Sequence, residues 1–189
     1  MTAAGRLGSL TPHPAAILVL SFVNTHAGGR GEQLEDAEGL RQWLSAAGHP
    51  DDAVSDADAA TAREFRDALQ TLLLAHAQQD ASPLEEVAHA EARLVRIADN
   101  APLCAVVSRE ATTLVPARNG LWGAFGALLA AITELDSAGL WQRIKACRNE
   151  ICHEGFLDRS RNASAIYHGP SCASMVSMRA YRQRKKDSR

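Results

Sequence analysis

The chain has 189 residues, of which 46% are apolar and 22% charged, and its formal net charge is −2. This composition can bury a core, so it excludes wholesale disorder and suits one sizeable domain with a small appendage. No apolar run approaches the roughly 18 residues that span a bilayer, and the short apolar segment 15–23 lacks the flanks of a secretion signal. We therefore expect a cytoplasmic protein.

Charge is distributed unevenly along the chain. Residues 141–189 contain 11 Lys and Arg against four Asp and Glu, a net charge of +7, whereas residues 1–140 carry −9. This asymmetry favours a polyanion as the partner of the C-terminal part, and DNA is the partner we expect. A basic tail that only keeps the chain soluble is the alternative.

The first 140 residues predict a mainly helical domain, preceded by a frayed segment over residues 1–13. Apolar residues recur with helical period in five stretches, and Ser55 and Ser82 are suitable N-caps. Gly48 and Pro50 end the second helix. The five predicted helices cover residues 15–26, 34–47, 56–79, 83–99 and 121–137.

A small β-hairpin is predicted between the last two of these helices. Residues 103–107 and 112–115 are short β-branched runs separated by a polar break, which is typical of two paired strands. Cys104 lies within the first strand, where we expect a small buried side chain. The fold class is therefore mainly α with a small hairpin (α+β), as a helical domain over 1–140 followed by a small C-terminal domain over 141–189.

The C-terminal segment contains a candidate metal site in a C-x4-C-x15-H-x3-C pattern. Its four members are Cys147, Cys152, His168 and Cys172. Thiolate and imidazole ligands in two close pairs are what tetrahedral zinc prefers, and four protein ligands leave no open position for catalysis. His153 competes with His168 as the fourth ligand, but adjacent residues rarely reach one metal. Buried thiols without a metal are the alternative.

Zinc has a physical role in so small a segment. About 45 residues with few apolar side chains cannot fold by burial alone, and zinc contributes on the order of 10 kcal/mol in small fingers. Metal-ligating thiols also suit a reducing compartment. The sequence therefore predicts zinc as a structural cofactor.

A basic helix is predicted after Cys172, from Ala173 to about Lys186. Its positive side chains and those of the preceding polar loop suit phosphate or guanine contacts. Met175 and Met178 should pack on the zinc core, and Asp158 should pair with an arginine or cap backbone amides. A solvated terminal helix is the alternative. The candidate nucleic-acid-binding residues are Arg159, Arg161, Arg179, Arg182, Arg184 and Lys186.

This segment resembles the CGNR zinc finger. The resemblance rests on Phe156-x-Asp158-x-Ser160-Arg161-Asn162, on Cys172 and on the run Arg179-Ala-Tyr-Arg182. The chain departs from the family at His168, where a cysteine is usual, and at 173–175, where Ala-Ser-Met replaces Gly-Asn-Arg. The resemblance implies DNA binding, and the missing tripeptide is the feature that argues against it.

The N-terminal part resembles the ABATE domain, the usual partner of that finger. The resemblance rests on Ser21-Phe-Val-Asn24-Thr25, on Leu40-x-x-Trp43-Leu44 and on Ala47-Gly48. It implies a domain that binds a small-molecule effector or forms a homodimer. Asn24, Thr25 and Arg30 are the candidate ligand-binding residues, and a capped helix end beside a surface loop is the alternative.

Together these features predict a transcriptional regulator that binds DNA, in which the helical domain senses an effector or dimerises. The alternative is a zinc-stapled module that binds a ligand or another protein without nucleic acid. A third possibility is thiol-based redox sensing through zinc release. No nucleotide loop, paired-carboxylate signature or nucleophile motif is present, so we expect no enzyme activity.

Overall fold

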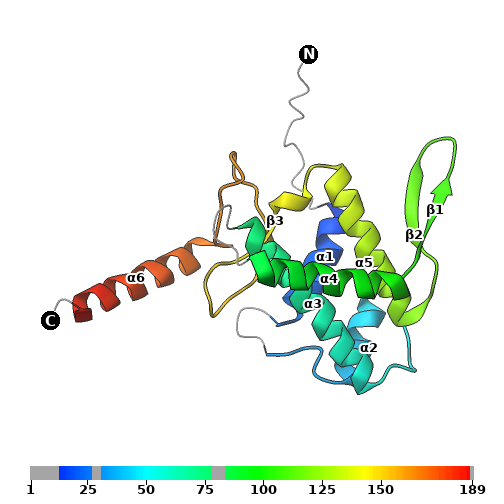
Figure 1. Ribbon diagram of the computed structural model, residues 1–189, viewed down its shortest axis with the longest axis horizontal. Helices are drawn as coiled ribbons and strands as arrows, with labels where there is room; N and C mark the ends of the chain where they lie inside the picture. The colour runs from blue at the N-terminus through cyan, green and yellow to red at the C-terminus, as the bar shows by residue number, and fades with distance from the viewer. Residues whose placement is uncertain (1–12, 27–30, 78–83, 188–189) are drawn as a thin grey trace, which may run out of the picture.

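The structure is a computed structural model that describes residues 13–26, 31–77 and 84–187 (Figure 1). Its helical part comprises α1 (Pro14–Val23), the 3-10 turn η1 (Asn24–His26), α2 (Ala37–Ala46), α3 (Asp56–His76), α4 (Leu84–Asn100) and α5 (Gly120–Ser137). The strands β1 (Leu103–Val107) and β2 (Thr112–Pro116) precede α5. The C-terminal part comprises η2 (Trp141–Arg143), β3 (Ile144–Ala146), β4 (Gly155–Leu157) and α6 (Pro170–Asp187).

The mainly helical prediction is confirmed, with differences at helix ends that have local causes. Helix α2 begins three residues later than predicted, because the Asp36 carboxylate accepts a hydrogen bond of 2.9 Å from the Gly39 amide and caps the helix there. Ser55 and Asp58 form a reciprocal capping box at the start of α3. Residues 1–12 and the predicted cap at Ser82 lie outside the described residues.

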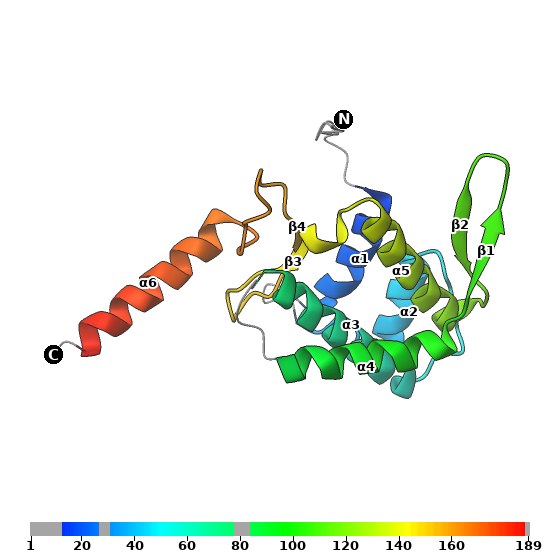
Figure 2. The same cartoon turned by 45° about the horizontal axis from the view of Figure 1, so that its top comes forward.

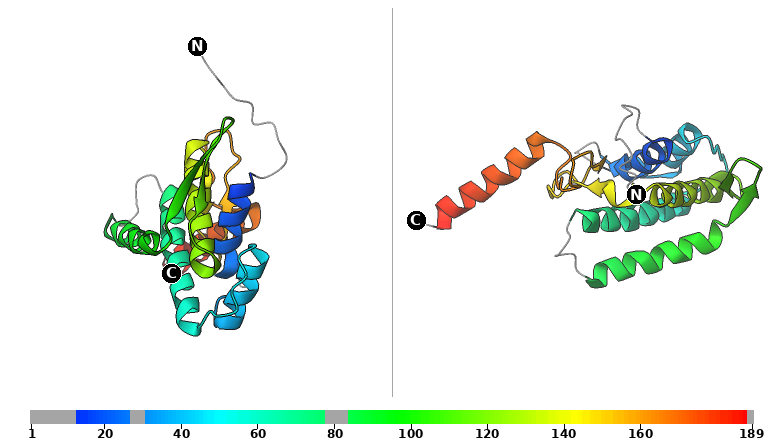
Figure 3. Two further views of the ribbon diagram at one scale, coloured as in Figure 1. Left: turned by 90° about the vertical axis from the view of Figure 1, so that its right-hand side faces the viewer. Right: turned by 90° about the horizontal axis from the view of Figure 1, so that it is seen from above.

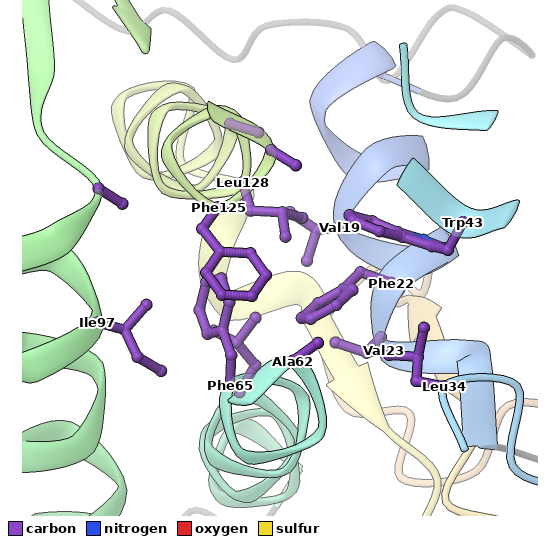
Figure 4. Close-up of a cluster of buried hydrophobic side chains, with 14 of the residues drawn as sticks. Val19, Phe22, Val23, Leu34, Trp43, Ala62, Phe65, Ile97, Phe125 and Leu128 are labelled. Atoms are coloured by element: carbon purple, nitrogen blue, oxygen red, sulfur yellow. The ribbon is translucent and has the colours of Figure 1, made fainter. Parts of the chain in front are cut away.

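The core of the helical part is an aromatic cluster (Figure 4). Phe22 of α1 lies 4.8 Å from Trp43 of α2 and 5.3 Å from Phe65 of α3, between ring centroids. Phe65 in turn makes an edge-on contact with Phe125 of α5 at 4.9 Å. Tilted aromatic pairs of this kind contribute about 0.5–1.5 kcal/mol each beyond the apolar area that they bury. One cluster therefore joins four helices.

The predicted β1–β2 hairpin is confirmed, but the environment of Cys104 was predicted wrongly. The strands pair antiparallel with Cys104 opposite Val115, and the hairpin extends outward from the helices (Figures 1 and 2). The base of the hairpin packs on the body, where Leu103 of β1 and Pro116 of β2 lie close to Gly126 of α5. Cys104 is consequently exposed to solvent.

A second hairpin, β3–β4, was not predicted and joins the C-terminal part to the helices. The two strands pair antiparallel with Lys145 opposite Phe156. All three residues of β3 are buried, and Ile144 and Ala146 belong to the same core as the aromatic cluster. The division of the chain at residue 140 stays a prediction, and core packing continues across that position.

Three side chains of the helical part form hydrogen bonds with the backbone of this hairpin and its turn. The Asn24 amide donates to the Gly155 carbonyl at 3.1 Å and accepts from the Gly155 amide at 2.7 Å. Gln70 of α3 donates to the His153 carbonyl at 2.9 Å, and His76 Nδ1 lies 2.8 Å from the Ile144 carbonyl. The turn η1 and helix α3 therefore hold the segment from which the candidate metal site is built.

Gly155 permits this close approach, which gives a first prediction. A Cβ atom at this position would lie 2.7 Å from Val23 Cγ2 and 3.1 Å from Leu20 Cδ2 of α1. We expect Gly155→Ala to lower the free energy of unfolding by about 1–3 kcal/mol, because overpacking forces the strand away from the helix. Urea unfolding followed by circular dichroism measures the change.

Gly169→Ala is the matched control, because nothing lies within 4 Å of its added Cβ. Equal stability of the Gly155→Ala chain and the wild-type chain would contradict the tight packing of β4 on α1.

Helix α6 extends away from the rest of the molecule (Figures 1 and 3). Of its side chains, that of Cys172 is buried, and every residue from Ser177 to Asp187 is exposed. The helix is therefore attached through its first turns alone. Within residues 13–26, 31–77 and 84–187, no helix combines the length and the apolar character that crossing a bilayer requires.

Candidate metal centre

The four predicted metal ligands come together in the structure. One ligand atom from each of Cys147, Cys152, His168 and Cys172 lies within 4.8 Å of every other. The three cysteines are buried and not joined in disulfides, and the His168 side chain is 28% exposed. Three sulfurs and one imidazole nitrogen so arranged fit around a zinc ion with bonds of about 2.0–2.3 Å. This donor set would hold zinc with no open coordination position.

A tight turn brings the first two cysteines together. Cys147 follows β3, and its amide donates to the Glu154 carbonyl at 2.9 Å, while the Cys152 amide donates to the Asn149 carbonyl at 2.7 Å. His153, directly after Cys152, adopts the left-handed conformation with φ of 48°, which turns the chain back into β4. The remaining two ligands come from the residues that lead into α6 and from its first turn.

His168 is the histidine of the cluster, as predicted, and His153 is not part of it. His168 Nδ1 lies 3.3 Å from Cys152 Sγ, and Nε2 lies 3.7 Å from the Glu154 carboxylate. Metal-bound histidines commonly turn their second ring nitrogen towards a carboxylate, which fixes the ring and makes it a better donor. Glu154 is therefore in position to orient His168.

The chemistry of the buried thiols also fits a cation. Burial, together with the neighbouring Cys172 and Cys147 thiols, raises the pKa of Cys152 to about 12 in the metal-free chain. Thiolates are the form that binds zinc, and a bound divalent ion stabilises them. The Asn149 side chain, which is fully buried, donates a hydrogen bond of 3.1 Å to Cys172 Sγ.

Asp158 organises the polar loop that follows β4. Its carboxylate lies 2.8 Å from Lys145 Nζ and accepts hydrogen bonds from the amides of Ser160 and Ala165 at 2.8 and 2.9 Å. Burial opposes ionisation, but these hydrogen bonds outweigh it and lower the pKa of Asp158 to about 2. The predicted capping of amides is confirmed, whereas the partner cation is Lys145 and not an arginine.

A family model named ABATE, described as a putative stress-induced transcription regulator, matches residues 17–138. The chain belongs to the ABATE family. A second model, the CGNR zinc finger, matches residues 143–185. Among the curated proteins, none matches the chain.

The zinc-finger part of this ABATE protein contains all four candidate ligands, so the family match and the donor set agree on zinc as the cofactor. The residues that support the ligands were not predicted as such. They are Asn149 and Glu154, which contact the ligands, and Lys145, which holds the following loop through Asp158. Each acts through a partner that is distant in sequence or through a backbone carbonyl, and ligand spacing gives no signal for such contacts.

The candidate nucleic-acid-binding residues lie on two surfaces of the ABATE protein. Arg159 and Arg161 are exposed on the loop that Asp158 organises, and the others are exposed on α6. At 3.6 residues per turn, Arg179, Arg182 and Lys186 share one face of α6, whereas Arg184 points to the opposite side. Arg179 Nη1 also lies 3.4 Å from Asn149 Oδ1, which connects that face to the metal centre.

The predicted packing of Met175 and Met178 on the zinc core is wrong for Met178. Met178 is 51% exposed, and Met175, at 41%, lies only at the rim of the metal centre. The partly buried apolar side chain that packs against the three cysteines is Tyr167. The reason is the direction of α6, which leaves the centre instead of folding back over it (Figure 1).

The candidate ligand-binding residues of the helical part make internal contacts. Asn24 binds Gly155, as described above. Thr25 is buried, donates to the Phe22 carbonyl at 2.8 Å and lies 3.4 Å from Arg66 Nη1. Arg30 lies outside the described residues. A ligand-binding role for these three residues stays a prediction.

Proposed function

We propose that this protein is a DNA-binding transcriptional regulator without enzyme activity, in which a zinc-held helix contacts the duplex. The single observation that carries the proposal is the exposed basic face of α6, formed by Arg179, Arg182 and Lys186, on a helix whose first turn supplies the ligand Cys172. The family description, a transcription regulator, supports the same function.

The role of the metal in this proposal is mechanical. Zinc, when bound, supplies cross-links between the turn after β3 and the start of α6, and so fixes the direction of the helix. Asn149 adds a second connection, because its side chain bonds both Cys172 Sγ and Arg179. A helix of 18 residues is about 27 Å long and matches the major groove in diameter.

The chemistry of the exposed face suits a duplex. Arginine binds phosphate or guanine in a bidentate manner, which favours it over lysine at such positions. Arg159 and Arg161, exposed on the finger loop, would add phosphate contacts beside the helix. The finger carries +7 and the helical domain −9, so the duplex would meet the finger first and be repelled by the rest.

A binding measurement tests this function. We expect Arg179→Gln combined with Arg182→Gln to weaken binding to mixed duplex fragments by at least about tenfold, because two charge contacts of roughly 1–3 kcal/mol are lost. The double variant should also show a shallower dependence of affinity on salt. Fluorescence anisotropy across a salt series measures both quantities.

Arg109→Gln is the matched control, because Arg109 is a fully exposed arginine at the tip of the distant β1–β2 hairpin. Wild-type affinity that does not fall with rising salt would reject phosphate contact. Equal affinities for the double variant and the wild-type chain would reject α6 as the reader.

A second candidate function, effector binding by the helical domain, is favoured by a cavity of about 480 Å³ between α1, α5 and β2. Its lining is mostly apolar, with Leu18, Leu114, Pro116 and Ala131 on its walls and Glu134 at its edge. Small-molecule sites commonly have this size and composition. A small apolar effector is thus the class of ligand that would fit, and thermal-shift screening tests it.

A further inference from the structure

Helix α6 has an exposed apolar flank that DNA binding does not use. Met175, Met178 and Tyr181 are 41%, 51% and 55% exposed. Residues three apart are neighbours on a helix surface, so these side chains form a continuous stripe that begins on the arginine face at Met175 and turns away from it towards Tyr181. A contiguous apolar stripe on a projecting helix marks a surface that meets another protein.

Helix α4 has a second exposed apolar stripe, on the side turned away from the body. Leu84 is 87% exposed and Val95 is 61% exposed, and the exposed Ala88 and Ala92 lie between them on the same side. The inner side of α4 packs through Ile97 on the core (Figure 4). Figures 2 and 3 show α4 as the outermost helix, with no other described element on its outer side.

The charges around the two stripes are complementary. Helix α4 carries four acidic residues against two arginines, whereas α6 carries five basic residues against one acidic residue. Two α6 helices packed on each other would bring like charges together, but α6 against α4 brings opposite charges together. The helices are 17 and 18 residues long, so their lengths match.

We propose that the partner of the α6 stripe is the outer face of α4 in a second copy of this chain. Within one chain α6 points away from α4, so the contact forms between copies (Figures 1 and 3). Exchange of α6 in both directions closes a two-fold dimer in which each surface is used twice. Stable interfaces bury roughly 1,200–2,000 Å² of surface in total, and the proposed dimer approaches this area because it contains two such helix pairs.

This dimer does not depend on DNA binding. Arg179 and Lys186 lie about 140–160° around α6 from Tyr181 and about 80–100° from Met178, so a contact through Met178 and Tyr181 leaves these two side chains accessible. The experiment below contains no nucleic acid, so its outcome and that of the duplex-binding experiment are independent.

Sedimentation velocity of the full zinc-loaded chain over a range of concentrations tests the proposal. We expect a monomer–dimer equilibrium that Met178→Glu weakens by about tenfold or more, and that Val95→Lys weakens to a similar degree. Combining the two substitutions places opposite charges against each other across the interface and restores association. Gln183→Glu adds the same charge as Met178→Glu about 140° further around α6, outside the stripe, and is the matched control that leaves association unchanged.

A monomer at every concentration would overturn the proposal, and so would a dimer that neither single substitution weakens. Both positions are exposed, and zinc content with circular dichroism verifies that the variants are folded. If either variant does not fold, Tyr181→Glu and Leu84→Lys repeat the test on the same two stripes. A wild-type dimer that fails to bind DNA would reject the regulator and leave the dimer intact.

Discussion

Replacing Cys172 by alanine should abolish stoichiometric zinc binding and unfold the C-terminal finger. Cys172 is 2% exposed and supplies one of four ligand atoms that lie within 4.8 Å of one another. Zinc contributes on the order of 10 kcal/mol to the folding of small fingers, and a site with three ligands left cannot retain that energy. Apolar packing around the ligands is slight, because Tyr167 is the partly buried apolar side chain packed against the three cysteines in the described part of the chain.

Two measurements detect the loss of zinc and the unfolding of the finger. Metal analysis should fall from one zinc per wild-type chain to a small fraction in the Cys172→Ala chain. Limited proteolysis should then cut within residues 147–187, while the helical body, whose core is separate from the cysteine cluster, resists. The loss of α6 should also lower the helical circular dichroism signal.

Cys104→Ala is the matched control, since Cys104 is an exposed cysteine on the hairpin, distant from the site. It should retain one zinc per chain. A Cys172→Ala chain with full zinc content, or a Cys104→Ala chain without zinc, would contradict the assignment of the ligands.

The second large effect is expected at the buried ion pair of the finger loop. Asp158 and Lys145 side chains are 0% and 4% exposed, and their charged atoms lie 2.8 Å apart. Asp158→Ala leaves a buried ammonium without its counter-charge and frees the amides of Ser160 and Ala165. Removal of one partner of a buried pair costs about 3–5 kcal/mol, so we expect the free energy of unfolding of the finger to fall by this amount.

Urea unfolding of the zinc-loaded chain, monitored by release of zinc to a chromogenic chelator, measures this cost. Glu110→Ala removes an exposed partner of Arg109 and serves as the control, with a change below about 1 kcal/mol. The double replacement Lys145→Met with Asp158→Leu should recover part of the stability, since it leaves no unpaired charge. A finger that tolerates Asp158→Ala as well as Glu110→Ala would contradict the structural role of the pair.

The Asp158–Lys145 pair also predicts how the stability of the finger depends on pH. Because the pKa of Asp158 is lowered to about 2 in the folded chain, its contribution to stability is fully present above its ordinary pKa of about 4. The contribution is lost as the pH falls through that interval towards 2. Asp158→Asn should therefore reduce stability at neutral pH and remove this part of the acid dependence.

The sequence allowed the helices and the metal ligands to be predicted because both depend on local spacing. Apolar residues at helical intervals, and ligands at Cys147, Cys152, His168 and Cys172, can be recognised without knowledge of the fold. Phe22, Phe65 and Phe125, which lie within three of the predicted helices, belong to the observed core.

Features that depend on distant partners could not be predicted in this way. Strand β3 has three residues, too few for an alternating pattern, and its burial depends on α3. Lys145 finds Asp158 thirteen residues away across the β3–β4 hairpin, and only the strand register brings them together. Cys104 is exposed because the hairpin extends outward from the helices. The residues of its own strand carry no signal for that direction.

The contacts of α1, η1 and α3 with the β3–β4 hairpin limit how the chain can be cut into separately folding fragments. In a fragment that begins after residue 143, the apolar side chains of Ile144 and Ala146 would be exposed to solvent. In the remaining fragment, the Asn24 side chain would lose its hydrogen bonds to the Gly155 backbone. The two parts are thus poor candidates for shuffling between unrelated proteins. Transfer of this finger to an unrelated protein would therefore require α1 and α3 to be transferred together with it.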